Sequence, residues 1–427
     1  MSESDMLARV KERLRAVLRR SAQTSAVERL LISTAALGLA VLVGTVLILV
    51  SGRMTTCTTA AATYFGVGFC YDPVTVFDRL FLGALGDPMN PLFRPLHGEF
   101  APPFRKGWSP FNAAMAVTLR ETTVLVFTGL SVALAFRAGV FNIGTQGQLV
   151  AGALASALGL LVLAPIVPGG AVGAVLLVPA GLCIGAVAGG LYGAIPGVLK
   201  AYADANEVIT TIMLNFVAAQ FALYLVSNHF QRPGSQVVET VPLPDVGTIP
   251  SVVFDPRTNF SLLALAIAIG FGGVIYYLLQ YTTMGYELRT SGLQPAGAEF
   301  GGVKTKRTII ASLTLSGALG GLGGAMYVMM ILGNFQTGVP SYGFDGITVA
   351  ILAGNNPLGV LFAAPLFGII KSGSIVIDTA TSMPPQLVDV LRGLIVLFVA
   401  MPEFFRLIGR RAIADEPSVP NGGDEDA

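Results

Sequence analysis

No charged residue occurs between Arg137 and Lys200, and this run restricts the fold more than any other feature of the sequence. A helix rises 1.5 Å per residue, so about 20 apolar residues cross the hydrocarbon core of a bilayer. The run is too long for one crossing, and the proline- and glycine-containing segment 164–170 divides it into two. Because a bilayer offers no partner to backbone N–H and C=O groups, such runs predict helices, whose hydrogen bonds are internal.

The composition agrees with a membrane protein and excludes several other classes. Apolar residues make up 53% of the chain and charged residues 12%, whereas soluble domains carry about 25% charged residues. A soluble protein of this length could not bury so much apolar surface. The net charge of +1 gives no basic field for nucleic acid, and three cysteines exclude a disulfide-rich scaffold.

The apolar runs predict an all-α fold, a polytopic transmembrane bundle of about ten helices with a broken helix in each half. The predicted helices are 30–50, 112–136, 147–164, 170–197, 207–227, 259–280, 308–332, 344–354, 357–373 and 386–405. The eighth is too short to cross alone and is expected to pair, as a half-helix, with the ninth. The first run exceeds the about 7–15 residues of a signal-peptide core, so we expect it to be retained.

Lysine and arginine side chains predict the orientation, because they are in excess on the cytoplasmic side of membrane proteins. They are frequent before residue 30, in the segment 281–307 and after residue 405, so both termini are expected in the cytoplasm. The N-terminal segment is either an interfacial basic helix or a frayed tail. The predicted divisions are 1–29 (basic, cytoplasmic), 30–407 (transmembrane domain), 51–111 and 228–258 (extracytoplasmic loops), 281–307 (cytoplasmic segment) and 408–427 (disordered acidic tail).

Signatures of enzymes and metal sites are missing from the sequence. There is no G-x-x-x-x-G-K-[ST] phosphate loop, so the chain cannot hydrolyse ATP by that route. The glycine cluster 317–324 lies inside an apolar run with no preceding strand, which excludes a dinucleotide site. His97, His229 and the three cysteines show no metal-ligand spacing. Cys57 and Cys70 share one outside loop, where they form either a disulfide or two free thiols.

Glycines recur at helical spacing within the apolar runs. The main stripe comprises Gly181, Gly185, Gly189, Gly193 and Gly197, and shorter ones are formed by Gly317 with Gly321 and Gly320 with Gly324. In lipid, such stripes let helix backbones approach closely. We interpret them first as packing surfaces, with movement between the helices as the functional alternative.

Three short polar segments interrupt the apolar runs, at 141–148, 343–346 and 354–357. Unwound backbone at membrane depth must face protein or a water-filled path, and paired breaks in two halves point to a transport route. The alternative is that they are ordinary turns. Among ionisable residues, Asp345, Asp389 and Arg392 could mark the path. Residues expected near helix ends, in solvated or interfacial positions, are Glu121, Arg137 and Glu207.

The segment 283–307 is unusually rich in small residues for a linker. Its pattern predicts a short helix followed by a glycine turn, and small side chains would let a partner protein seat closely against that helix. A solvated loop is the alternative interpretation.

Four motifs resemble those of permeases in the importer family for branched-chain amino acids, ribose and nucleosides. Residues 141–148 resemble the F-N-I-G-x-x-G-Q motif of that family, and the others lie at 206–215, 285–303 and 342–359. The resemblance covers about residues 111–405 and favours the nucleoside and simple-sugar branch. Departures from the family pattern are Thr145 and Gln146 for Ala and Glu, Thr290 and Gln294 for Ala and Asn, Gly297 for Ala, and a long loop over 54–108.

The resemblance implies a site and a set of partners. The coupling residues it implies are Gly285, Leu288, Arg289, Gly292, Ala298 and Gly302. The translocation-path residues it implies are Asn142, Gly144, Gln148, Asn206, Glu207, Asn215, Asp345, Asn355 and Asn356. The implied partners are a cytoplasmic ATPase with two nucleotide-binding sites, a second homologous permease and an extracytoplasmic solute-binding protein. The chain itself would contact membrane lipid, bind no cofactor and no nucleic acid, and have no catalytic or metal site.

The function that follows is a multi-pass permease subunit in the plasma membrane, serving an ATP-driven ABC importer for a monosaccharide or nucleoside. One alternative is a branched-chain amino acid permease. A second is an ion-coupled secondary transporter, for which only Asp345 and Asp389 offer buried carboxylates. A membrane enzyme would need clustered nucleophile chemistry that the sequence does not contain.

Overall fold

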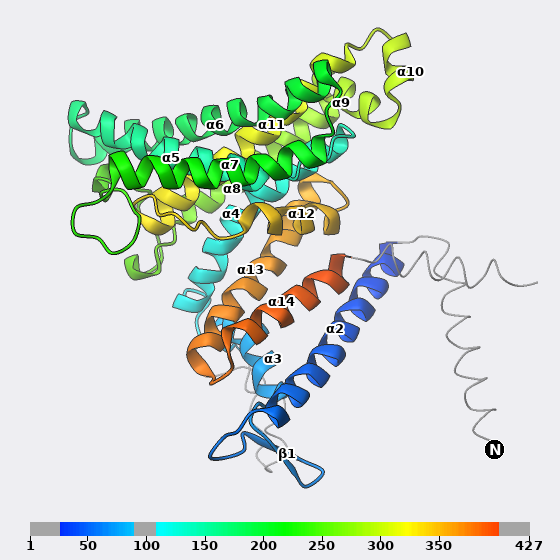
Figure 1. Ribbon diagram of the computed structural model, residues 1–427, viewed down its shortest axis with the longest axis vertical. Helices are drawn as coiled ribbons and strands as arrows, with labels where there is room; N and C mark the ends of the chain where they lie inside the picture. Colours follow the sequence, from blue (N-terminus) through cyan, green and yellow to red (C-terminus); the bar gives the residue numbers. More distant parts are fainter. Residues whose placement is uncertain (1–25, 89–107, 401–427) are drawn as a thin grey trace, which may run out of the picture. The chain divides into compact units, whose positions relative to one another are not determined.

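The computed structural model describes residues 26–88 and 108–400, and these are mostly helical (Figure 1). All ten predicted helices are present. They are α2 (Ala26–Met54), α4 (Ala113–Arg137), α5 (Thr145–Leu163), α6 (Gly170–Ala203), α7 (Glu207–Leu225), α8 (Leu262–Tyr281), α11 (Thr305–Met326), α12 (Tyr342–Leu352), α13 (Pro357–Ala380) and α14 (Pro385–Ala400). Eight helices among the described residues are long and apolar enough to cross a bilayer. The predictions for 1–25 and 408–427 lie outside the described residues.

The chain divides into two compact units, 1–73 with 389–427 and 74–388. In the first, a hairpin follows α2. Strands β1 (Ala62–Tyr64) and β2 (Val67–Phe69) pair antiparallel, joined by a two-residue turn whose residues both have positive φ. Cys57 and Cys70 form a disulfide, which settles the two alternatives left by the sequence. The amide of Cys70 donates to the carbonyl of Gly52 (3.0 Å), tying the hairpin to the end of α2.

The second unit is built around α4 and α11, which are the most buried of the candidate spans. Helix α11 packs against α5 and α6, while α4 packs against α12 and α13, and the two contact each other. Helices α6, α7 and α8 turn apolar side chains outward, as expected of lipid-facing surfaces. The expected loop 51–111 also contains structure here, α3 (Pro73–Phe81) and the 3-10 turn η1 (Gly83–Leu85). Gly373 of α13 packs against the backbone of Leu80 in α3.

The glycine stripes are helix-packing surfaces, as the sequence predicted. A Cβ placed on Gly189 of α6 would lie 2.6 Å from the Cα of Gly321 on α11, and one on Gly185 would lie 2.7 Å from the Cβ of Ala325. From the other side, Gly152 of α5 meets the backbone of Gly321. Three helices therefore meet backbone to backbone, which only residues without a side chain permit.

The predicted polar breaks are only partly confirmed. Residues 141–144 are non-helical, and a turn with Gly354 and Asn355 at positive φ separates α12 from α13. The segment 343–346, however, is not a break, because it lies in the first turns of α12. Its small and polar residues are explained by close packing, since a Cβ on Gly346 would lie 2.7 Å from Thr128 of α4.

A polar cluster joins two loops of the second unit. The carboxylate of Glu239 accepts hydrogen bonds from the amides of Asn334 and Gln336, both at 2.9 Å, and from the hydroxyl of Ser235 at 3.0 Å. Arg232 forms an ion pair with it at 3.3 Å. These partners favour the ionised form, so the pKa of Glu239 lies below its ordinary value, chiefly because Asn334 donates to it.

We predict that Gly189→Ala lowers the melting temperature, because one methyl group would overlap the backbone of α11 and overpacking costs about 1–3 kcal/mol. Gly273→Ala in α8 is the matched control, since nothing lies within 4 Å of its added Cβ. Thermal unfolding of both variants in the same detergent, followed by gel filtration, measures the effect. Equal melting temperatures for the two variants would contradict the packing analysis.

The Glu239 cluster predicts a pH dependence of stability. Because the folded pKa is lowered, the stabilisation is fully present above the unfolded pKa of about 4.3 and is lost as the pH falls through the folded value. The difference in melting temperature between the parent and Glu239→Gln should therefore shrink between pH 7 and pH 3. A difference that stays constant over this range would show that ionised Glu239 does not hold the loops.

Candidate coupling and translocation site

The segment between α8 and α11 folds into two short helices rather than the single one that the sequence predicted. Helix α9 (Thr283–Leu293) begins at Thr282, whose hydroxyl accepts from the amide of Gly285 (3.1 Å). Gln294 is extended, and Pro295 then starts α10 (Pro295–Phe300), as a proline at the first helical position favours. The predicted glycine turn follows, with Gly302 at φ +86°.

Four of the predicted coupling residues fasten this segment to the chain itself. Leu288 and Ala298 are buried, and Gly285 packs against the backbone of Leu279 at the end of α8. Gly292 packs against Gly139, which follows α4. A Cβ on Gly292 would lie 2.7 Å from the amide nitrogen of Gly139, and one on Gly139 would lie 2.8 Å from the Cα of Gly292.

The structure gives a reason for the small size of Gly285 and Gly292 that does not involve a partner protein, and seating of a partner here stays a prediction. They are small because the chain's own backbone occupies the space a side chain would need. Arg289 is half buried and donates to the side-chain oxygen of Gln280 (3.3 Å) and the carbonyl of Gly285 (3.4 Å), while Gly302 is exposed.

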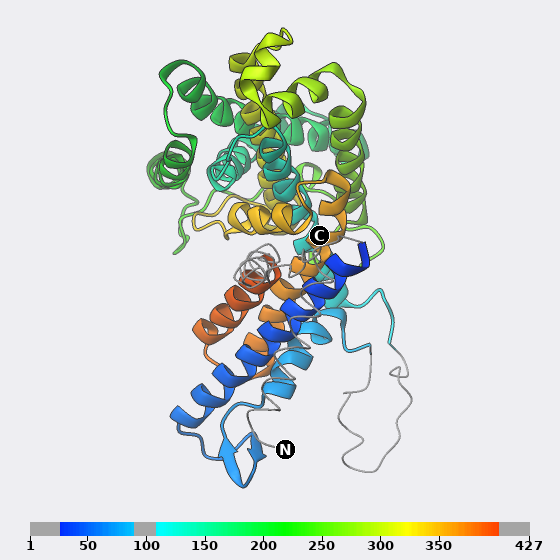
Figure 2. The same ribbon diagram turned by 90° about the vertical axis from the view of Figure 1, so that its right-hand side faces the viewer.

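Three large apolar side chains are exposed on α9 and α10, a feature that the sequence analysis missed. Phe300 is 97% exposed, Leu293 is 87% exposed and Tyr286 is 59% exposed. Figure 2 shows both helices, in yellow-green, at one end of their unit. The sequence did contain a signal for this exposure, namely large apolar residues in a segment predicted to lie outside the membrane. Such exposure on a firmly anchored base is typical of a docking surface.

Residues 137–139 connect this surface to both polar breaks. While Gly139 contacts Gly292, the guanidinium of Arg137 donates to the backbone carbonyl of Asn355 (2.8 Å). Asn355 lies in the turn between α12 and α13, and the chain beyond Gly139 runs directly into the break at 141–144. Three consecutive residues therefore contact α9, precede the first break and contact the turn at the second break.

The first break is a buried knot of neutral polar groups, which we name the amide knot (Asn142, Gly144, Gln148, Asn215 and Ser316). Asn142 donates to Ser316 on α11 (2.7 Å) and to Gln148 on α5 (3.0 Å), and its oxygen accepts from the amide of Gly144 (2.9 Å). Asn215 of α7 accepts from the amide of Gly147 and donates to the carbonyl of Ile143. The structure thus brings together four of the predicted path residues.

The other predicted path residues lie elsewhere. Asn206 caps the N-terminus of α7, and Glu207 beside it forms an ion pair with Lys200 (2.6 Å). Asn355 forms the turn described above, and Asn356 caps α13 by accepting from the amide of Leu358 (3.0 Å). These residues begin helices or shape turns, and their place along a path stays a prediction.

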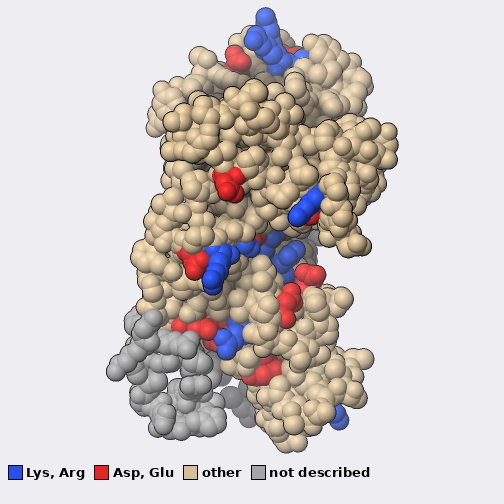
Figure 3. Space-filling model, turned by 90° about the vertical axis from the view of Figure 1, so that its left-hand side faces the viewer, with Lys and Arg blue, Asp and Glu red and all other residues tan. Residues whose placement is uncertain are grey.

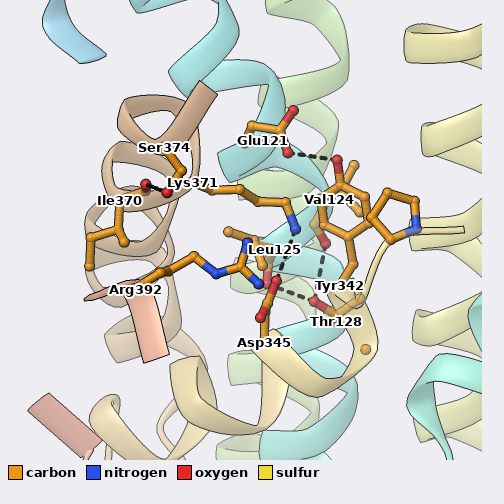
Figure 4. A network of polar contacts seen from close by, with 12 residues as sticks. Glu121, Val124, Leu125, Thr128, Tyr342, Asp345, Ile370, Lys371, Ser374 and Arg392 are labelled. Atoms are coloured by element: carbon orange, nitrogen blue, oxygen red, sulfur yellow. Dashed lines mark hydrogen bonds and ion pairs between the residues drawn. The ribbon is translucent and has the colours of Figure 1, made fainter. Parts of the chain in front are cut away.

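Asp345 belongs to a charged network that joins α4, α12 and α13 (Figure 4). It pairs with Lys371 (2.9 Å), whose ammonium lies 3.8 Å from the centre of the Tyr342 ring. The hydroxyl of Tyr342 donates to Glu121 (2.6 Å), and Arg120 pairs with the same carboxylate (3.0 Å).

The prediction that Glu121 is solvated or interfacial is wrong, because it is only 2% exposed and has two partners in the network. The sequence analysis did not predict Arg120, Tyr342 and Lys371 as site residues. Lys371 could have been found, because it is an isolated lysine within an apolar run. The other proposed path markers, Asp389 and Arg392, belong to the first unit. A guanidinium nitrogen of Arg392 lies 4.0 Å from a carboxylate oxygen of Asp389.

The contacts of Gln146 explain why glutamine can replace the glutamate of the family pattern. Its amide nitrogen donates to the carbonyls of Val339 (3.3 Å) and Pro340 (3.0 Å), and its oxygen accepts from the amide of Gly343 (2.8 Å). A carboxylate can only accept when ionised. Glutamine therefore satisfies a site that needs donor and acceptor together, which removes the need for a buried charge.

The fold defines a multi-pass helical membrane protein with eight candidate spans among the described residues. Residues 114–400 match the family described as the branched-chain amino acid transport system permease component, and the chain belongs to this family. It is a transport subunit of the plasma membrane rather than an enzyme, and permeases of this family work with an ATPase and a solute-binding protein.

Three of the curated relatives have names that state a transported solute. The nucleoside ABC transporter permease protein NupB of Lactococcus lactis subsp. cremoris is 31% identical over 78% of this chain and 85% of its own. The guanosine ABC transporter permease protein NupP of Bacillus subtilis is 35% identical over 68% and 82%. The glucose ABC transporter permease protein TsgB13 of Haloferax volcanii is 30% identical over 70% and 80%. No solved structure matches the chain.

The charged network predicts a non-additive effect of two substitutions. Lys371→Gln leaves the partly buried Asp345 without its cation, which should cost about 1–3 kcal/mol of stability. The double variant Asp345→Asn with Lys371→Gln should recover part of this loss, because no charge is then left unpaired. Melting temperatures of the parent, both single variants and the double variant measure the coupling. Strictly additive shifts would mean that the pair contributes nothing as a pair.

Proposed function

We propose that this chain is the permease subunit of an ATP-driven importer for nucleosides, with a monosaccharide such as glucose or ribose as the second candidate solute. An extracytoplasmic binding protein delivers the solute, and a second homologous permease completes the pore. A cytoplasmic ATPase with two nucleotide-binding sites drives the cycle. The relatives NupB, NupP and TsgB13, named for nucleoside, guanosine and glucose transport, support the solute class.

The observation that carries the coupling proposal is the exposed pair Leu293 and Phe300. Leu293 ends α9, which is fastened to the chain by Gly292 and Leu288, and Phe300 ends α10, in which Ala298 is buried. An apolar surface that protrudes in this way gains stability when a partner buries it. The ATPase grips these side chains, and the close backbone contact at Gly139 passes its movement inward.

The orientation proposed is that both termini and α9–α10 face the cytoplasm. Lys304, Lys306 and Arg307 follow α10, and excess lysine and arginine marks the cytoplasmic side. The hairpin that carries Cys57 and Cys70 directly follows α2, the first crossing, and then lies outside the cell, where an oxidising environment suits a disulfide.

The mechanism proposed for the switch uses the two polar breaks. When the ATPase pulls α9, residues 137–139 follow, because Gly292 cannot slide past Gly139 without separating the two backbones. Arg137 carries the displacement to the α12–α13 turn, and the chain beyond Gly139 carries it to the amide knot. Hydrogen bonds there exchange between protein partners and the hydroxyl-rich solute, which offers similar donors and acceptors.

The function is tested by uptake into proteoliposomes that contain the permeases and the ATPase, with binding protein and solute added outside. We expect ATP-dependent accumulation of radiolabelled nucleosides against a gradient, competed by unlabelled nucleoside and not by leucine. Accumulation by the permeases alone, without the ATPase, would contradict an ATP-driven importer. Competition by leucine but not by nucleoside would assign the branched-chain amino acid alternative.

The coupling surface predicts the effect of a single truncation. Phe300→Ala should weaken ATPase binding by about 2 kcal/mol, or about 30-fold, as for an aromatic residue at the centre of an interface. Phe221→Ala is the control, because Phe221 is also an exposed phenylalanine (59%) but lies on the outward face of α7. Affinity measured by titrating the ATPase onto immobilised permease gives the result. Equal affinities for both variants would place the docking surface elsewhere.

A further inference from the structure

A groove of about 620 Å³ opens between the C-terminal end of α6, the start of α9 and the first three turns of α11. Basic residues line the groove at the start of α11, and apolar residues line it further along the same helix. Lys304, Lys306 and Arg307 line one part, and Ile310, Ala311 and Leu315 line another. The groove thus combines three cations with an apolar wall that continues along the same helix.

The positive charge in the groove is not neutralised within the described residues. All three cations are exposed, and none forms an ion pair with a described carboxylate. The nearby carboxylate of Glu299 accepts from the hydroxyl of Thr305. Lys306 lies 5.5 Å from the centre of the Tyr202 ring, a contact that does not compensate its charge. The groove therefore favours an anion. Figure 3 shows Lys and Arg side chains at the end that carries α10.

The apolar wall belongs to the membrane-spanning part of the chain. Helices α6 and α11 both lie in candidate spans, Gly170–Ala203 and Thr305–Leu332. The cations stand at the outermost turn of α11, and the apolar residues follow one to three turns deeper. Tyr202, at the end of α6, adds an aromatic ring of the kind enriched at the membrane–water interface. The groove therefore reaches from the interface into the hydrocarbon region.

We propose that this groove binds an anionic phospholipid, with the phosphate on Lys304, Lys306 and Arg307 and an acyl chain along Ile310, Ala311 and Leu315. Only an amphiphile satisfies both parts of the groove. A soluble phosphate would leave the apolar wall uncovered, and the acidic surface of a soluble partner could not reach into a span. Basic grooves at the cytoplasmic ends of spans attract anionic head groups for the same electrostatic reason.

The bound lipid would also join α6, α9 and α11, the three helices whose residues line the groove. Met284 at the start of α9 is one of these residues, so the base of the coupling helices contacts the site. Anionic lipid should therefore stabilise the folded protein in proportion to its occupancy, because it binds the folded state alone.

The test uses the delipidated full-length protein in detergent, with phosphatidylglycerol as the anionic probe and phosphatidylcholine as the neutral one. Phosphatidylglycerol should raise the melting temperature by about 2–4 °C and phosphatidylcholine should not. The variant Lys304→Gln with Lys306→Gln should lose about half of this shift or more. Its charge-matched control is Arg53→Gln with Arg257→Gln, two exposed arginines that do not line the groove, which should retain it.

A second variant separates a lipid from a soluble anion. Ala311→Trp fills the apolar wall while all three cations remain, so it should also lose the shift, and native mass spectrometry should count fewer bound phosphatidylglycerol molecules. Soluble glycerol 1-phosphate should not protect the parent.

Several outcomes would overturn the proposal. One is an equal shift for the groove variant and its charge-matched control. A second is protection by glycerol 1-phosphate equal to that by phosphatidylglycerol, which would make the groove a soluble-anion site. A third is a full shift in Ala311→Trp. If the cation variant loses ATPase binding but keeps its lipid shift, the groove belongs to the protein partner.

Discussion

The contact between the backbones of Gly139 and Gly292 is the interaction on which the proposed coupling depends. It joins helices outside the spans to a chain segment that enters the membrane interior. A side chain on either residue would hold the two segments apart, and a flexible side-chain contact would absorb movement rather than transmit it. Leu288 and Gly285 fasten α9, which ends at the exposed Leu293, and the buried Ala298 fastens α10, which ends at the exposed Phe300.

Inside the bilayer, the need to pair every polar group shapes both the amide knot and the charged network around Tyr342. The amide knot is satisfied by neutral groups, each of which can donate and accept, and such bonds exchange partners at little cost. The network around Tyr342 instead uses charges, which hold α4, α12 and α13 more firmly because an unpaired charge there is expensive. The two halves of the unit therefore differ in how readily their polar contacts can rearrange, and the neutral half adjoins the coupling contact.

Much of this protein could be predicted from local signals. Long apolar runs with few charges predicted the ten helices, because the bilayer forces backbone pairing within each run. Glycines at a spacing of four predicted the α6 and α11 surfaces, and the motif at 141–148 located the amide knot. The hairpin after α2 and the second coupling helix were missed, because both are short and apolar periodicity needs longer segments. The break expected at 343–346 was wrong, since small residues there serve contact with α4.

The sequence by itself determined that the chain crosses a membrane, where its helices lie and which family its motifs resemble, because these depend on the composition and order of neighbouring residues. Only the tertiary structure decided what each marked residue contacts. Gly292 proved to pack on the chain's own Gly139, Glu121 proved to be buried with Tyr342, and Lys371 proved to be the partner of Asp345. These pairs join residues far apart in the sequence, and the distance between such residues is set by how helices pack, which no local pattern encodes.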